Sequence, residues 1–136
     1  MKIALATCVD APHTASDDHP MHEALSRRGI DVCIPAWDDG AVDWAQFDAC
    51  VVRTTWDYTE RCEAFLGWAD EASQQTRLFN SAPLLRWNSH KTYLRELQEV
   101  GIPVAPTAWF DAGAEIELSS VLTERGWKEA MVKPLV

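Results

Sequence analysis

Residues 47–58 read FDACVVRTTWDY, and their pattern decides the fold class. Ala49 to Val52 is a continuous apolar run, as found in parallel strands that are covered on both faces. Polar and aromatic residues follow this run directly. We therefore expect a buried strand over 47–54 that ends in a polar loop.

The segments on either side of this stretch continue an alternation of strand and helix. The expected strands are 2–9, 30–37, 47–54 and 78–79, and the expected helices are 19–28 and 59–75. Pro20 would stand in the first turn of its helix and Gly29 just after the end. This order predicts an α/β fold: an open, mostly parallel, Rossmann-like sheet with helices on both faces.

Beyond Pro83 the pattern changes. The sequence predicts a helix over Ser89 to Val100, an extended stretch over 102–110, a helix over 118–125 and a strand over 129–136. We expect an α/β domain over 1–82, a connecting helix segment over 83–104 and an incomplete domain over 105–136. The last residues, MVKPLV, stop inside an apolar run, which we interpret as a truncation.

Composition and charge narrow the classes of partner. The chain has 136 residues, a net charge of −9 and a pI near 4.7. Nucleic-acid binding depends on clustered basic residues, so we expect a small molecule or a protein as partner. No stretch approaches the roughly 18 apolar residues of a membrane span, and the apolar part of MKIALATCVD is too short for a signal peptide.

The four cysteines indicate the compartment. They form no Cys-x-x-Cys pair, and we interpret them as free thiols. They are Cys8, Cys33, Cys50 and Cys62. Together with the absence of a membrane or export signal, this predicts a cytoplasmic protein.

The end of the strand over 47–54 supplies the first candidate site. Ligands of open parallel sheets bind beyond the carboxyl ends of the strands, which is where Arg53, Trp56, Asp57 and Tyr58 fall. An arginine offers a bidentate fork to a carboxylate, and Asp57 could hold an ammonium group. The alternative is a surface ion pair between Arg53 and Asp57, with the aromatic rings packed over a loop.

Two lysines supply the second candidate site. Lys91 would lie in the first turn of a helix, where the backbone dipole disfavours a cation, and Lys133 interrupts the apolar run over 130–136. Each has an ordinary explanation: Lys91 as an exposed lysine, and Lys133 as a side chain that reaches solvent from an edge strand. Together they favour a polyanionic ligand, because backbone amides at a helix start and an ammonium group form an anion site.

Several other patterns predict no site. Asp10, Asp17, Asp18, His19 and His22 cluster after the first strand, but helix capping explains the aspartates, and we expect no metal site. Residues 7–13 contain no glycine, which excludes a dinucleotide-binding fingerprint. No serine or cysteine nucleophile set is indicated by spacing, and we expect no catalytic residue in this chain.

These motifs also carry a family resemblance. WNSHKTYLRELQEVGIPVAPT, residues 87–107, followed by MVKP at 131–134, resembles the opening segment of ATP-grasp ligases. RTTWDY at 53–58 and NSAPLLRWN at 80–88 are similar to a subgroup related to glutathione synthetase and to the cyclo-ligase of D-cycloserine biosynthesis. The resemblance covers essentially the whole chain.

The resemblance implies a function. Residues 1–82 would be the pre-ATP-grasp domain and 105–136 the start of the ATP-grasp lid, with Lys91 and Lys133 on ATP and the loop from Arg53 to Tyr58 at an amino-acid-like substrate. The family joins a carboxylate to an amine through an acylphosphate with Mg²⁺. The magnesium ligands would lie beyond residue 136, so we expect this fragment alone to be inactive.

The sequence is also compatible with two other classes of protein, and it predicts an oligomer. The chain could be a non-catalytic domain that binds a small molecule. It could also be a phospho-receiver module, although such a module needs an aspartate where Arg53 stands. An unpaired edge strand over Glu129 to Val136 would favour dimers or larger species.

Overall fold

The computed structural model describes residues 1–10 and 14–136, and the side chains of all of these except residues 14–17. They form two compact units, Met1–His90 together with Val136, and Lys91–Leu135. Each unit is considered by itself. The domain boundaries expected after residues 82 and 104 stay predictions.

The first unit is built on a parallel sheet, as the sequence predicts. Its four strands have the order β2-β1-β3-β4, and every described pairing is parallel. The strands are β1 (Lys2–Thr7), β2 (Asp31–Cys33), β3 (Ala49–Thr54) and β4 (Arg77–Phe79). β2 is shorter than expected because Pro35 lacks a backbone donor. The chain rejoins β1 after it, where the Trp37 N–H donates to the Thr7 carbonyl at 2.7 Å.

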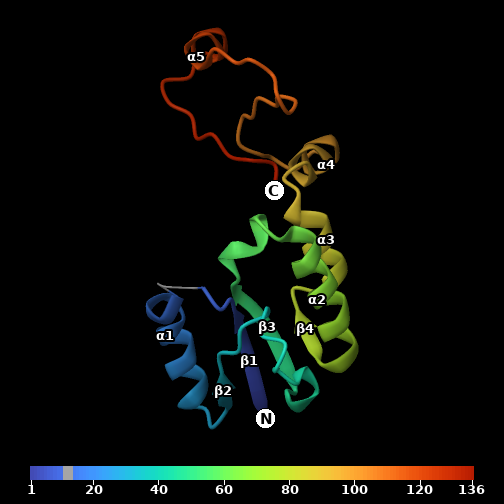
Figure 1. The fold of residues 1–136 in the computed structure, drawn as a ribbon. Coiled ribbons are helices and arrows are strands. Elements are labelled where there is room, and N and C mark those ends of the chain that lie inside the picture. Colours follow the sequence, from blue (N-terminus) through green and yellow to red (C-terminus); the bar gives the residue numbers. More distant parts are fainter. Residues whose placement is uncertain (11–13) are drawn as a thin grey trace. The chain divides into compact units, whose positions relative to one another are not determined.

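Helices cover both faces of this sheet, which confirms the expected fold class (Figure 1). The elements are α1 (Thr14–Ser26), the 3-10 turns η1 (Trp44–Gln46) and η2 (Trp56–Thr59), α2 (Cys62–Gln75) and α3 (Ala82–Ser89). Side chains alternate across a strand, so Ile3 and Leu5 pack toward α1, while Ala4 and Ala6 join the core on the α2 side.

Two helices differ from the expectation. α1 begins at Thr14, so Pro20 lies inside the helix and not in its first turn. The helix tolerates the lost backbone donor because Met21 and Leu25 pack against the sheet. α3 was not predicted, because Pro83 was interpreted as a break. In the structure Pro83 stands at the start of this helix, where its missing N–H costs nothing.

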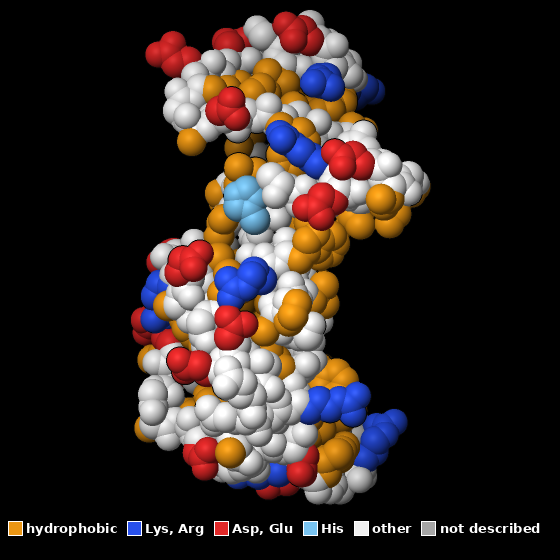
Figure 2. Space-filling model, turned by 90° about the vertical axis from the view of Figure 1, so that its right-hand side faces the viewer, with side chains coloured by type: hydrophobic (Ala, Val, Ile, Leu, Met, Phe, Trp, Pro, Cys, Tyr) orange, Lys and Arg blue, Asp and Glu red, His pale blue; other side chains and the backbone are white. Residues whose placement is uncertain are grey.

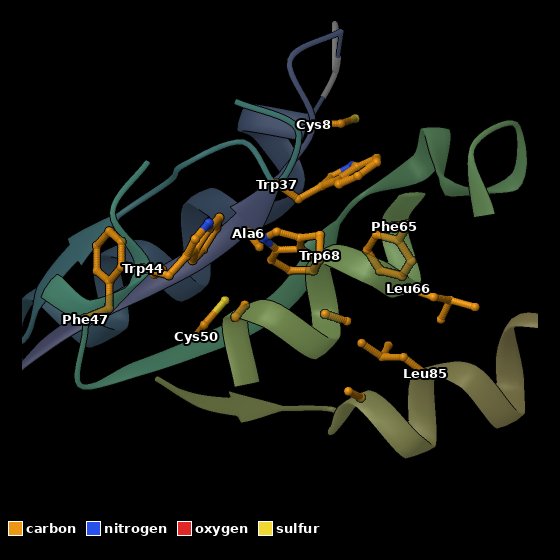
Figure 3. Packing of buried hydrophobic residues seen from close by; sticks show 14 residues of the cluster. Ala6, Cys8, Trp37, Trp44, Phe47, Cys50, Phe65, Leu66, Trp68 and Leu85 are labelled. Carbon is orange, nitrogen blue, oxygen red and sulfur yellow. The ribbon is translucent and has the colours of Figure 1, made fainter. Parts of the chain in front are cut away.

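An aromatic cluster fills the core on the α2 side (Figure 3). The Trp68 ring lies 5.1 Å from that of Trp44 and 5.4 Å from that of Phe65, measured between centroids. Trp37 meets Phe65 edge-on at 5.4 Å. Such pairs add stability beyond the burial of their area. Trp37 also borders the loops at the carboxyl end of the sheet, so this core supports the region where a ligand is expected.

The second unit contains two helices, α4 (Tyr93–Glu99) and α5 (Leu118–Arg125). Glu117 caps α5 through the Ser120 N–H at 2.7 Å, and hydrogen bonds from Ser119 and Ser120 lower the pKa of Glu117 to about 2. Gly126, with φ of 66°, closes the helix in the left-handed conformation that favours glycine. Hydrophobic side chains reach the surface of this unit (Figure 2), and Met131 is 79% exposed.

Two expectations for this part of the chain were wrong. No single helix runs over 89–100: α3 ends at Ser89 and α4 begins at Tyr93. His90 and Thr92, on either side of Lys91, are weak helix formers, and Lys91 precedes the first turn of α4. The described residues 129–136 form no strand, since they have no sheet neighbour to pair with. The oligomer expected through this segment stays a prediction, without the strand that motivated it.

The four cysteines are free and differ in exposure. Cys50 is fully buried in β3, and burial raises the pKa of its thiol to about 12. We expect iodoacetamide at pH 8 to alkylate the partly exposed Cys33 and Cys62 first, and Cys50 only after denaturation, because the thiolate is the reactive form. Peptide mass mapping over time measures the order. Early labelling of Cys50 would contradict the burial of β3.

Candidate functional site

The sheet order places a ligand crevice between two particular strands. β1 lies between β2 and β3, so the chain leaves it toward α1 on one face and later returns to cover the other face through α2. In open α/β sheets this topological switch point, at the carboxyl ends of the strands, is where ligands bind. Thr7 and Thr54 end the two central strands and are paired after a register shift between Ala6 and Thr7, with 3.1 Å between their hydroxyl oxygens.

One polar network at this edge joins α1 to β3. The Arg53 Nε donates to Asp18 Oδ1 at 2.8 Å, and the Arg53 Nη2 lies at the same distance from that oxygen. Thr54 Oγ1 donates to the other carboxylate oxygen of Asp18 at 3.1 Å. The side chain of Asp18 is 1% exposed and that of Arg53 is 39% exposed. A buried carboxylate thus fixes a half-exposed guanidinium.

A second network fixes the loop after β3. The Trp37 Nε1 donates to Asp57 Oδ1 at 2.9 Å, and Arg61 forms ion pairs with Asp57 and with Asp38, the latter at 2.7 Å. Asp38 also accepts the Val9 N–H at 2.8 Å. The guanidinium of Arg61 lies over the Trp37 ring, 4.8 Å from its centroid. This network ties the loops after β1, β2 and β3 together.

The surface ion pair between Arg53 and Asp57, the alternative to a binding site, does not form. Arg53 is paired with Asp18 of α1, and Asp57 is paired with Arg61. Both carboxylate oxygens of Asp57 are already occupied. Asp57, which the sequence suggested as a ligand for an ammonium group, is therefore already bonded to Trp37 and Arg61 within the fold.

Trp56 and Tyr58 are also separated. Trp56 is 69% exposed, whereas Tyr58 packs against Phe65, with 5.5 Å between ring centroids. Of the four sequence-predicted residues, Arg53 and Trp56 are exposed, whereas Asp57 and Tyr58 are half-buried. Sequence reasoning missed Asp38 and Arg61. The spacing of four residues between Asp57 and Arg61 was an available signal.

The electrostatics of the second network lower two carboxyl pKa values. For Asp38, burial alone would raise the pKa, but hydrogen bonds from Arg61 and the Val9 N–H outweigh it. For Asp57, burial is likewise outweighed by hydrogen bonds from Trp37, Arg61 and Cys8. Burial raises the pKa of the Cys8 thiol, so Cys8 is protonated at neutral pH.

These shifts predict acid sensitivity. Since the folded pKa values of Asp38 and Asp57 lie below the ordinary 3.8, the stabilisation is complete above about pH 5 and is lost as pH falls through the folded values. We expect the thermal midpoint to fall less between pH 5 and pH 3 in the double variant Asp38→Asn, Asp57→Asn than in the wild type. Scanning calorimetry at several pH values measures this. Equal pH slopes would contradict the assignment.

The acidic cluster after β1 shows no metal-type arrangement in the part that the structure describes. Asp18 is bonded to Arg53, and His19 Nδ1 lies 3.6 Å from a Glu23 carboxylate oxygen. Among the described side chains, those of residues 1–10 and 18–136, no group of three or more His, Cys, Asp or Glu residues could hold an ion. The side chain of Asp17 lies outside the described residues.

The two lysines belong to the second unit, and their backbone segments meet there. The Lys91 N–H donates to the Leu135 carbonyl at 2.7 Å, two residues from Lys133. Within the described residues neither ammonium group is part of an ion pair. The anion site that the sequence suggested at a helix start does not form in that way, because Lys91 lies before the start of α4.

Among the described residues, no helix has the length and apolar character of a membrane span.

These features define an α/β domain with an open parallel sheet and polar networks at its topological switch point. The family model for the D-cycloserine synthetase DcsG N-terminal domain matches residues 3–80, and the chain belongs to this family. The cycloserine biosynthesis protein DcsG of Streptomyces lavendulae is 39% identical over 99 residues, which are 73% of this chain and 33% of that protein.

A solved structure extends the similarity beyond the family model. The crystal structure of D-cycloserine synthetase DcsG matches 93% of this chain and 43% of its own chain, with 34% identity and a TM-score of 0.76. The chain therefore spans between a third and a half of the length of these relatives.

Proposed function

We propose that this chain is the N-terminal part of an ATP-dependent carboxylate-amine ligase of the ATP-grasp type. It would act on an amino-acid-like substrate through an acylphosphate, in the cytoplasm. The observation that carries the proposal is the match to D-cycloserine synthetase over 93% of the chain, which includes residues outside the matched family model. The whole reaction needs further residues, so the chain alone would supply binding groups only.

Within this proposal, the second unit supplies cations for the nucleotide. Lys91 and Lys133 would hold ATP phosphates, and their fit is supported by the bond between Lys91 N and Leu135 O and by the lack of ion pairs to either ammonium in the described chain. Mg²⁺, when bound with ATP, would neutralise phosphate charge during transfer. Its ligands would lie beyond residue 136.

The first unit would supply the amino-acid site at the carboxyl edge of β3. Arg53 can hold a carboxylate through charge-assisted hydrogen bonds, and the exposed Trp56 offers a ring face. Asp57 and Tyr58 would shape the loop, since their side chains contact Arg61, Trp37 and Phe65.

A chimera tests the proposal. Residues 1–136 would replace the aligned N-terminal part of the Streptomyces lavendulae protein, and ADP release would be measured with MgATP and a panel of amino acids and derivatives. We expect ADP release that depends on one member of the panel. A folded chimera that releases no ADP, or releases it equally without any amino acid, would contradict the proposal, provided that the parent protein is active in the same assay.

Calorimetry separates the ligase from a purely binding domain. If the folded chimera binds an amino acid but never MgATP, the non-catalytic alternative is favoured.

A further inference from the structure

The guanidinium of Arg53 is bound on one edge and open on the other. Its Nε and Nη2 both contact Asp18 Oδ1 at 2.8 Å. In the part of the chain that the structure describes, Nη1 has no hydrogen-bond partner, and the side chain is 39% exposed. A guanidinium carries five N–H donors in a planar fork, so the edge formed by Nη1 and Nη2 can still receive a second, bidentate partner.

Asp18 cannot itself reach a ligand. It is 1% exposed, and Thr54 Oγ1 and the Arg53 fork occupy its two oxygens. A buried carboxylate in this position orients the arginine and limits its side-chain freedom. Any effect of Asp18 on binding must therefore act through Arg53.

The open edge lies at the place where the fold favours a ligand. Arg53 precedes Thr54, the last residue of β3, and Thr54 is paired with Thr7 at the end of β1. The switch point of the sheet falls between these two strands. Topology and side-chain geometry thus point independently to the same position.

We infer that Asp18 is a positioning residue that holds Arg53 with its outer edge open for a carboxylate group of the substrate. The inference rests on the proposed function and deepens it, because it assigns the residue that positions Arg53 and the edge of the guanidinium that receives the carboxylate. It also distinguishes a binding residue near the end of β3, Arg53, from a structural residue in the loop that follows, Asp57, whose oxygens are already occupied.

The chemistry of the pair sets the selectivity. Asp18 compensates the charge of Arg53, so recognition depends on the planar fork more than on net charge. A lysine at position 53 keeps the charge but loses the fork, and it should not replace the arginine. A ligand with a neutral amide in place of its carboxylate offers Arg53 fewer acceptors and no charge, and it should bind more weakly.

Nuclear magnetic resonance titration of the chain with D-serine tests the inference, with D-serinamide as the neutral analogue. We expect D-serine, and not D-serinamide, to shift the guanidinium resonances of Arg53. Arg53→Lys should weaken D-serine binding about tenfold or more, and Asp18→Asn by several-fold, while both keep the backbone amide spectrum of the folded chain. Asp48→Asn, an exposed acid at the opposite end of the sheet, is the control and should bind normally.

Four results would each overturn the inference: no D-serine response in the wild type, an equal response to D-serinamide, unchanged affinity in folded Arg53→Lys, or unchanged affinity in folded Asp18→Asn. The ADP assay of the chimera decides the ligase separately. ADP release together with unchanged D-serine binding in both variants would overturn this inference and leave the ligase standing.

Discussion

Replacing Trp37 by alanine will lower the free energy of unfolding by about 3–5 kcal/mol, the range for removing a large aromatic side chain from a core. Trp37 is 6% exposed and packs against Phe65 and Trp68. Its Nε1 also donates to Asp57, so the substitution leaves a cavity and a carboxylate without one of its donors. Chemical denaturation at pH 7 measures the change.

Trp37→Phe separates the two contributions. It keeps most of the ring volume and removes the donor to Asp57, so we expect a loss of about 1–3 kcal/mol. A loss below about 1 kcal/mol in Trp37→Ala would show that the aromatic core does not support the loops at the carboxyl edge.

The second large effect concerns the nucleotide. In the chimera, Lys91→Ala and Lys133→Ala should each raise the KM for ATP about 10- to 100-fold, as expected when a charge-assisted bond to phosphate is lost. Lys128→Ala, an exposed lysine of the same unit, is the matched control and should leave the KM unchanged. Unchanged KM values in both lysine variants would remove these residues from the ATP site, whatever the activity of the chimera.

The sequence was sufficient for the fold class because buried strands and helices leave periodic patterns. The continuous apolar run in β3 and the stripe of Phe65, Leu66 and Trp68 in α2 were both readable. Local breaks were harder to predict. Pro83 can end an element or begin one, and only packing of Leu85 into the core decided for a helix.

The candidate site was predictable in place but not in detail. Topology located Arg53 and Asp57 at the carboxyl edge, because any residue after a parallel strand falls there. Their partners could not be predicted, since Asp18 is 35 residues from Arg53 and Trp37 is 20 from Asp57. Which carboxylate meets which arginine depends on how α1 and the loops pack. Lys91 shows the converse: its position in a helix was assumed, and the helix begins two residues later.

We propose that this chain contributes to a ligase that activates a carboxylate by phosphorylation. The most direct test supplies the active chimera with an amino-acid substrate whose carboxylate carries ¹⁸O in both positions. The carboxylate oxygen attacks the terminal phosphorus of ATP, ADP leaves, and the amine then displaces phosphate from the carbonyl carbon. We expect each released phosphate to contain one ¹⁸O atom, which mass spectrometry of the phosphate measures. Phosphate without ¹⁸O, formed together with the ligated product, would contradict it.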